Sequence, residues 1–479
     1  MVIFNKNEMN MKTVILLFLT LLANESFGQS EKAQNKVVGD AFEKLYNSDD
    51  FEGIFAMFGA NMSEALPLGK TTQFLAGLKM QAGKIVEREF VGYENTSAAY
   101  KTKFEKAVFG LYISIDKESK INGLLVKPYV EKRSADKVVN DLSIENAQLS
   151  KKQLEMIFEG AKVFPAETQL AFAIIKEGVV SYYGVKRLAD KLTTIDNHNS
   201  IFEIGSISKV FTSTLLAGMV VDKKVNLEGD INDHIDVRDN AIISLRELSN
   251  HTSGLPRLPM NLDLNNVDPN NPYKEYDGAD LKDYMSNMLE LEEDKRGKFE
   301  YSNIGAGLLG YILAKHEGTS FDNLLRRNIF SKYDMNSSTV DHKKVTAEFV
   351  NGRNSDGEIV PNWEFASLAG AGGILSNVVD LSKFAIAQFD SSNQELALTQ
   401  QETFAADDGT KVGLGWFIIS SKSGKQLLWH NGATGGYSSS MAIDIKNKNA
   451  IVILTNVSAF NPDSAGIDQL CFGLMETLD

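Results

Sequence analysis

The sequence predicts an α+β protein with two domains behind a short N-terminal leader. Three observations lead to this prediction. Residues 33–129 change from a helical to a strand-like spacing of apolar side chains, and residues 131–152 are charged and polar. Beyond this stretch, strand patterns stand at both ends of the chain and helical patterns fill the region between them. Such an order is typical of one antiparallel sheet, built from distant parts of the chain and flanked by helices.

The leader carries a signal-peptide pattern, which we assign to residues 1–28. Lys12 precedes an apolar run, Val14–Ala23, and small residues follow up to Gly28. A basic start, about ten apolar residues and a small-residue cleavage site are the features of a secretory signal. The run is too short to span a bilayer, and no cysteine follows it to carry a lipid. We expect a secreted or periplasmic protein that has no stable membrane anchor and whose mature chain starts at Gln29.

The first domain is predicted to cover residues 30–132. Helical spacing runs from residue 33 to about residue 58, with a break at 47–50. Four strand patterns follow: Lys84–Tyr93, Ala98–Phe104, Val108–Ile115 and Ile121–Tyr129. Two helices and an antiparallel meander make a small α+β domain. It shows no acid–base pair, so we expect a packing or binding module.

The second domain is predicted to cover residues 150–479. It begins with a helix over Leu154–Val163 and ends with a helix that includes Glu476. Between them lie a hairpin, a long helical region and a late group of strands. The predicted strands are Gln169–Ile175, Val179–Val185, Gly413–Ser420, Gln426–Trp429, Ser438–Asp444 and Ala450–Asn456.

Composition narrows the class of function. The 479 residues carry a formal net charge of −14, whereas nucleic acids and anionic membranes require a basic face. We therefore expect a small-molecule, peptide or ester substrate and no nucleic-acid partner. The one cysteine, Cys471, lies in an apolar helical stretch and is expected to be buried. One cysteine and six histidines without metal-ligand spacing lead us to expect neither a metal nor a cofactor.

The first candidate motif is Ser206-Ile-Ser-Lys209, which follows Gly205 and opens an apolar helix. Residues three apart on a helix share a face, so Lys209 should lie beside the Ser206 hydroxyl. A serine hydroxyl becomes a useful nucleophile when a base takes its proton, and a desolvated lysine can be that base. Taken alone, Ser206 could equally be a helix N-cap.

The second candidate motif is Tyr301-Ser-Asn303. On a short turn, Tyr301 and Asn303 can project to the same side. A phenol can exchange a proton with a serine, and a nearby Lys209 ammonium is expected to lower the pKa of Tyr301. The Asn303 amide can hold a substrate or the lysine. Taken alone, Tyr301 fits an ordinary half-buried aromatic residue better.

The third candidate motif is His430-Asn-Gly432, followed by Ala433, after an apolar strand that ends at Trp429. A glycine-rich strand edge allows a substrate to lie against it as an added strand. A backbone N–H on this edge can complete an oxyanion hole with the N–H of Ser206.

Each motif is common, but the ordered set is not. The set resembles the three motifs of the penicillin-recognising serine enzymes: Ser206-x-x-Lys209, Tyr301-x-Asn303 and His430-x-Gly432. Tyr-x-Asn is the form found in class C β-lactamases and related D,D-peptidases. For residues 150–479 the resemblance implies a β-lactamase/transpeptidase-like fold, with an antiparallel sheet, flanking helices and a helical subdomain. The first domain resembles the cone-shaped nuclear-transport-factor-like domains, both in pattern and in the phrase Ile121–Tyr129.

The resemblance also implies a role for each motif residue. Ser206 is acylated, and Lys209 and Tyr301 form the base network, with Tyr301 later activating the deacylating water. The remaining residues bind the substrate: Asn303 orients it, His430 and Gly432 line the pocket edge, and Ala433 supplies the second oxyanion N–H. His251, in the nearby family-like phrase Leu245–Pro256, fits a structural loop residue better than a catalytic one.

One departure affects the expected activity. β-Lactamases and D,D-peptidases usually carry Lys-Thr-Gly at the third motif, where the lysine helps to hold the substrate carboxylate. Here His430 stands in that place, and an imidazole is mostly uncharged at neutral pH. His-x-Gly resembles the motif of the family's esterases and D-aminopeptidases.

We therefore expect a serine hydrolase that acts through an acyl-enzyme on ester or amide bonds. The enzyme alternative is a peptidoglycan D,D-carboxypeptidase or a β-lactamase. The alternative from another class is a non-catalytic protein that binds or senses peptidoglycan fragments.

Overall fold

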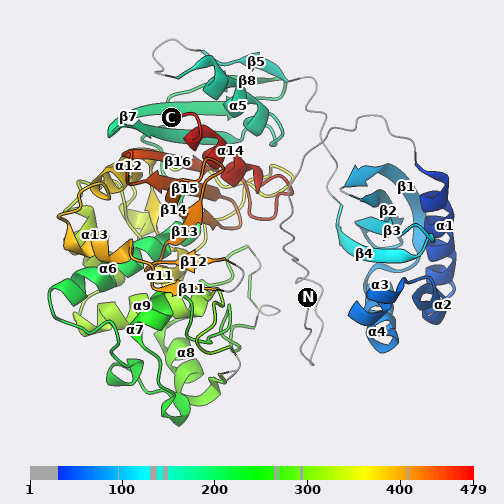
Figure 1. Ribbon diagram of the computed structural model, residues 1–479, viewed down its shortest axis with the longest axis horizontal. Coiled ribbons are helices and arrows are strands. Elements are labelled where there is room, and N and C mark those ends of the chain that lie inside the picture. Colours follow the sequence, from blue (N-terminus) through cyan, green and yellow to red (C-terminus); the bar gives the residue numbers. More distant parts are fainter. Residues whose placement is uncertain are drawn as a thin grey trace. The chain divides into compact units, whose positions relative to one another are not determined.

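The chain forms two compact units, Met1–Lys132 and Arg133–Asp479, which are described separately (Figure 1). The predicted signal peptide lies outside the residues that the computed structural model describes. Those residues are 31–94, 96–129, 138–143, 149–263, 267–268, 270–291, 295–406 and 409–478.

In the first unit, helices pack on a four-stranded antiparallel sheet in the order β1-β2-β3-β4. The helices are α1 (Ala33–Asn47), α2 (Phe51–Ala56), α3 (Ala60–Ala65) and α4 (Leu68–Ala82). The strands are β1 (Ile85–Glu94), β2 (Ser97–Phe104), β3 (Val108–Ile115) and β4 (Ile121–Pro128). The predicted meander is therefore present, close to its expected bounds.

The prediction of only two helices before the meander is wrong, because α3 and α4 were not expected. Helix α4 does carry a helical signal, since Thr71, Leu75, Leu78 and Ala82 are all buried at spacings of three and four. The glycines and threonines between these positions weaken the pattern. Packing of this buried stripe against the sheet core stabilises α4 in spite of its modest propensity.

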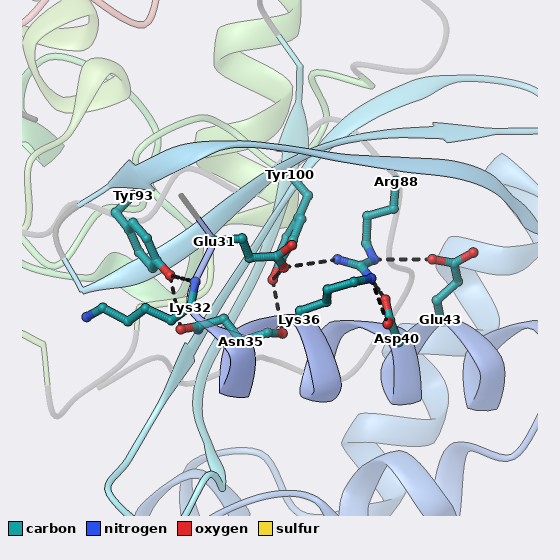
Figure 2. A network of polar contacts seen from close by, with 9 residues as sticks. All are labelled: Glu31, Lys32, Asn35, Lys36, Asp40, Glu43, Arg88, Tyr93 and Tyr100. Atoms are coloured by element: carbon teal, nitrogen blue, oxygen red, sulfur yellow. Dashed lines mark hydrogen bonds and ion pairs between the residues drawn. The ribbon is translucent and has the colours of Figure 1, made fainter. Parts of the chain in front are cut away.

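A buried arginine joins α1 to the sheet of the first unit (Figure 2). The Arg88 side chain is 5% exposed and forms ion pairs with Glu31, Asp40 and Glu43. Its guanidinium also stacks over the Tyr100 ring, 4.3 Å from the ring centroid. The Tyr100 hydroxyl donates to Glu31 Oε1 at 2.8 Å. The buried charge is thus neutralised by carboxylates, which is the arrangement that a buried cation requires.

The second unit is built on a ten-stranded sheet in the order β11-β12-β13-β14-β15-β16-β6-β7-β8-β5. Two further short strands, β9 (Phe202–Glu203) and β10 (Leu375–Ser376), pair with each other. The strands of the large sheet are β5 (Val139–Asp141), β6 (Gln169–Lys176), β7 (Val179–Arg187), β8 (Lys191–Thr194), β11 (Phe404–Ala405), β12 (Lys411–Val412), β13 (Phe417–Ser420), β14 (Gln426–Ala433), β15 (Ser438–Asp444) and β16 (Asn449–Thr455).

Helices cover both faces of this sheet. Alternate residues of β6 enter two separate cores, so that Leu170 and Phe172 pack with α5 and α14, whereas Ala171 and Ala173 face the core that contains α6 and α9. The helices are α5 (Lys151–Ala161), α6 (Ser208–Val221), α7 (Leu245–Ser249), α8 (Gly278–Asp283), α9 (Asn303–His316), α10 (Phe321–Leu325), α11 (Ala369–Gly372), α12 (Val378–Ala387), α13 (Gln394–Thr399) and α14 (Gly466–Met475).

The α+β prediction is confirmed, and the sheet does join both ends of the second unit, because β6 pairs with β16. Several details differ from the prediction, and the strand expected at Gly413–Ser420 begins at Phe417. The sheet is not wholly antiparallel, since β5, in the predicted linker, pairs in parallel with β8. The last helix ends at Met475, one residue before Glu476. Strand β14 continues past Trp429 to Ala433, because its polar end pairs with β15.

Two smaller observations complete the description. Cys471 is a free cysteine and is fully buried, as expected. Within the described residues, we find no helix with the length and hydropathy of a membrane span.

Candidate active site

The Ser206 segment is a sharp turn that leads into a buried helix. Residues Gly205–Ile207 form a 3-10 turn that continues directly into α6. Gly205 has a φ of 52°, and a Cβ atom at this position would lie 2.5 Å from the backbone nitrogen of Ala433. Both the backbone conformation and the close approach require glycine. Ser206 itself is only partly buried, so its hydroxyl stands at the start of α6, where a substrate can reach it.

Lys209 is the central residue of the site. Its Nζ lies 3.0 Å from Ser206 Oγ, 2.9 Å from Asn303 Oδ1 and 2.7 Å from the carbonyl oxygen of Ala371. The side chain is 1% exposed, and its described partners include no carboxylate. Burial, and then the positive charge of Arg257, hold the pKa of Lys209 well below its ordinary value.

These contacts suit a neutral amine. The Asn303 and Ala371 oxygens can only accept hydrogen bonds, so they take the two N–H groups that a neutral lysine retains. The lone pair of Nζ is then left for the hydroxyl hydrogen of Ser206. The arrangement can therefore withdraw the serine proton, which is what a general base must do.

Tyr301 covers Lys209 with its ring. The Lys209 Nζ lies 4.8 Å from the ring centroid, and the Tyr301 hydroxyl is hydrogen-bonded with Ser206. The expectation that the lysine lowers the pKa of Tyr301 is wrong. Burial raises this pKa to about 12, and the opposing effects of the Ser206 hydrogen bond and the Arg257 charge are smaller. The phenol stays protonated at neutral pH, so it is suited to donate a proton, and Lys209 is the better base.

His251 holds this tyrosine in place. Its ring centroid lies 4.5 Å from that of Tyr301, and its Nδ1 accepts a hydrogen bond from the Ser302 N–H at 3.2 Å. Burial, followed by the charges of Lys209 and other neighbours, holds the pKa of His251 well below its ordinary value, so the ring is neutral. His251 therefore has the structural role that the sequence suggested, and it fulfils this role inside the site, by packing against Tyr301.

The third motif lies on strand β14 and packs directly against the nucleophile segment. A Cβ atom on Gly432 would lie 2.0 Å from the carbonyl oxygen of Ile204 and 2.8 Å from the backbone nitrogen of Ser206. The Ser439 hydroxyl, on the neighbouring strand, donates to the same Ile204 oxygen at 2.8 Å. No side chain fits at Gly432. The strand edge therefore brings the backbone of Ala433 next to that of Ser206, as an oxyanion hole requires.

His430 is a buried neutral imidazole. Its Nδ1 lies 2.6 Å from the carbonyl oxygen of Asn431 and donates to it, because a carbonyl can only accept. Burial is the main cause that lowers the pKa of His430 to about 3, and the Lys209 charge adds to it. The side chain is 1% exposed. His430 therefore supplies no positive charge to a substrate, which agrees with the expectation from its place in the motif.

The structure brings all seven predicted residues together, and it adds two that sequence reasoning missed, Ala371 and Arg257. The carbonyl of Ala371 reaches Lys209 through helix packing that no short sequence motif indicates. Arg257 lies 5.2 Å from the Tyr301 ring centroid. It follows Leu255 and Pro256 directly, and a lone charged residue in this apolar, proline-rich loop was a signal that could have been used.

No group of three or more His, Cys, Asp or Glu side chains among the described residues is arranged to hold a metal ion. The chemistry derived above uses only the chain's own hydroxyl, amine, phenol and backbone groups.

Comparison with known proteins gives the family. The model of the Beta-lactamase family matches residues 164–470, so this chain belongs to that family. A second model, described as a protein of unknown function (DUF3887), matches residues 40–124. The family resemblance that the three motifs indicated is confirmed.

The relatives are distant. Penicillin-binding protein 4* of Bacillus subtilis is 26% identical over 286 residues, which cover 54% of this chain and 61% of that protein. A β-lactamase of Pseudomonas fluorescens is 25% identical over 268 residues, which cover 52% of this chain and 68% of that protein. The crystal structure of a class C β-lactamase from Rhodobacter sphaeroides matches with a TM-score of 0.57 and 18% identity, over 69% of this chain and 99% of that one. The predicted β-lactamase/transpeptidase-like fold is confirmed.

Proposed function

We propose that the second unit is a serine hydrolase that cleaves ester or amide bonds through an acyl-enzyme on Ser206. The observation that carries this proposal is the position of the Lys209 amine. It is buried without a carboxylate partner and lies 3.0 Å from the Ser206 hydroxyl. A buried amine with a lowered pKa beside a partly exposed serine is a poor arrangement for stability alone, and it is the arrangement that activates a nucleophile.

The reaction follows from the geometry. Lys209 takes the proton of Ser206 as Oγ attacks the substrate carbonyl carbon. The N–H groups of Ser206 and Ala433 stabilise the oxyanion. The bond to the leaving group breaks, and the Tyr301 phenol, which is protonated at neutral pH, passes a proton to that group and regains one from Lys209. Water then attacks the acyl carbon as Lys209 takes one of its protons, the bond between the acyl carbon and Ser206 Oγ breaks, and Oγ takes that proton from Lys209, which restores the hydroxyl and the neutral amine.

The neutral third motif favours an esterase or a D-amino-acid peptidase. His430 cannot form an ion pair with a carboxylate at neutral pH, because its pKa is about 3. The D,D-carboxypeptidase or β-lactamase alternative is supported by the names of the relatives, a penicillin-binding protein and a β-lactamase. A binding or sensing role without turnover is the third possibility.

Covalent labelling tests the proposal. The full chain is incubated with a fluorophosphonate or a labelled penicillin, and the modified peptide is identified by mass spectrometry. We expect one adduct, on Ser206. Ser206→Ala should lose both label and turnover and keep its circular dichroism spectrum, because Ser206 is only partly buried. Ser392→Ala, at an exposed loop serine, is the matched control and should label normally. Folded wild-type protein without an adduct would contradict both enzyme alternatives.

Substrate panels then separate the activities. Rapid hydrolysis of p-nitrophenyl esters with slow nitrocefin turnover would support the esterase assignment. Fast nitrocefin turnover, or release of D-alanine from a peptide that ends in D-Ala-D-Ala, would support the alternative.

We also propose that the protein acts outside the cytoplasm, on the basis of the signal pattern at residues 1–28. The mass of the exported protein tests this proposal. We expect a mature chain that starts at Gln29, and an uncleaved chain in the cytoplasmic fraction would contradict it.

A further inference from the structure

Arg257 is an exposed positive charge beside the second motif. Its carbonyl oxygen accepts hydrogen bonds from the backbone nitrogens of Asn303 at 2.9 Å and Ile304 at 3.3 Å, so its backbone is tied to the second motif. Its guanidinium lies 5.2 Å from the Tyr301 ring centroid. Arg257 is exposed, whereas Lys209, His251 and His430 are buried.

Within the part of the chain that the structure describes, the side chain of Arg257 has no counterion. No ion pair or side-chain hydrogen bond joins it to a described residue, and its guanidinium lies over the face of the Tyr301 ring. Elsewhere in the second unit, the half-buried Arg246 is paired with Glu228 and the exposed Arg327 with Glu317. A guanidinium is well suited to bind a carboxylate in two-pronged fashion, and here that capacity is unused.

The rest of the site also lacks negative charge. No described carboxylate is hydrogen-bonded to Ser206, Lys209, Asn303 or Tyr301, and His430 is neutral. The positive charge of Arg257 is felt by Lys209, His251 and Tyr301, and no carboxylate offsets it in any of the three. An anionic group of a substrate placed beside Arg257 would therefore meet a positive electrostatic potential that no described carboxylate offsets.

We propose that Arg257 is the residue that selects substrates with an anionic group close to the scissile carbonyl. The inference rests on the proposed acyl-enzyme function, and it names the substrate class of that site. Arg257 stands beside the second motif. The neutral His430 of the third motif then does not prevent recognition of a carboxylate, because the cation that binds it comes from a different loop.

The experiment compares charged and neutral esters of matched shape. kcat/KM is measured for mono-p-nitrophenyl glutarate against p-nitrophenyl butyrate, and for 4-acetoxybenzoate against its methyl ester. The first pair places the carboxylate on the acyl group and the second places it on the leaving group. Wild-type protein, R257K, R257Q and R257E are compared. R238Q, at a half-buried arginine in another part of the second unit, is the control.

We expect the charged-to-neutral ratio of kcat/KM to fall at least tenfold in R257Q for one of the two pairs, mainly through KM. The ratio should fall further in R257E, remain near the wild-type value in R257K and R238Q, and decrease with added salt, because an exposed charge is screened. An unchanged ratio for both pairs in R257Q and R257E, in protein whose Ser206 still reacts with the neutral fluorophosphonate, would overturn the inference. Failure of Ser206 to react in wild-type protein would instead overturn the proposed function.

Discussion

Each of the two units contains a buried basic side chain, and the two side chains have opposite kinds of partner. In the first unit, three carboxylates pair with Arg88, whose side chain is 5% exposed (Figure 2). In the second unit, Lys209 is 1% exposed, and its hydrogen-bond partners among the described residues are a hydroxyl, an amide oxygen and a backbone carbonyl.

The difference separates stability from reactivity. A buried charge with counterions holds elements together, and its removal leaves the counterions unpaired. A buried amine without counterions gives up its proton more easily, at a cost in stability, and so becomes a base. The same kind of side chain thus joins a helix to a sheet in one unit and, in the function that we propose, activates a nucleophile in the other.

Replacing Lys209 gives the largest expected effect. Lys209→Met should slow acylation by about 10³-fold, because the general base is lost. The melting temperature should stay the same or rise, since an apolar side chain replaces an unpaired buried amine. Stopped-flow acylation and calorimetry measure the two quantities, and Lys176→Met, at an exposed position, serves as the control. Wild-type acylation in Lys209→Met would remove the lysine from the mechanism.

A second variant removes only the Tyr301 hydroxyl and leaves Lys209 in place, which sharpens the comparison. Tyr301→Phe keeps the ring over Lys209 but loses the proton donor, so acylation should slow by about 10²-fold. An ester with a good leaving group needs less help from a proton donor and should be affected less than an anilide. Equal rates for wild type and variant on both substrates would contradict the assigned role.

Arg88→Met tests the contribution of the carboxylate-paired arginine to the stability of the first unit. It should destabilise the first unit by about 2 kcal/mol, since three carboxylates lose their partner. Hydrolysis by the second unit should not change. Lys36→Met, on helix α1, is the control: its ion pair with Asp40 is exposed, and such pairs contribute about 0.5 kcal/mol or less. Urea unfolding followed by hydrogen exchange in residues 33–128 measures the effect, and equal stabilities of the two variants would refute the claim.

The smallest expected effect is a shift in the pH profile. kcat/KM should fall as the pH decreases through the pKa of Lys209, because the ammonium form has no lone pair to accept the Ser206 proton. Arg257 helps to hold this pKa down. Arg257→Gln should therefore raise it and move the acidic limb of the profile to higher pH, whereas Arg257→Lys should leave the limb near its place. A limb that moves to lower pH in Arg257→Gln would contradict this account.

Local patterns predicted the elements that are long or strongly periodic. The meander of the first unit and the β6–β7 hairpin follow from alternating apolar residues. Helix α4 was missed because glycines and threonines dilute its apolar stripe, and β8, with four residues, is too short to show a period. The end of β14 was missed because Gly432 and Asn431 have little strand propensity. Pairing of Asn431 with Ser440 and of Gly432 with Ser439 holds them in the sheet.

The site was predicted to the extent that its chemistry lies in short motifs. Ser206 and Lys209 are neighbours on one helix face, so local spacing was enough to join them. The Ala371 carbonyl depends on how α11 packs against α6, and the position of Arg257 depends on a loop that is hydrogen-bonded to α9. The pKa of Tyr301 was predicted in the wrong direction because burial, which the sequence does not report, outweighs the neighbouring charges.

The strand order of the second unit has a consequence for how the protein is made. Strand β6 pairs with β16, and the backbone of Gly432, far along the chain from Ser206, packs against the Ser206 backbone. Contacts between such distant segments form slowly and late. A nascent chain that already contains Ser206 still lacks the end of strand β14, whose backbone is expected to stabilise the oxyanion. During refolding, hydrolysis should therefore return after the bulk of the helical signal, so that catalysis itself reports the final step of assembly.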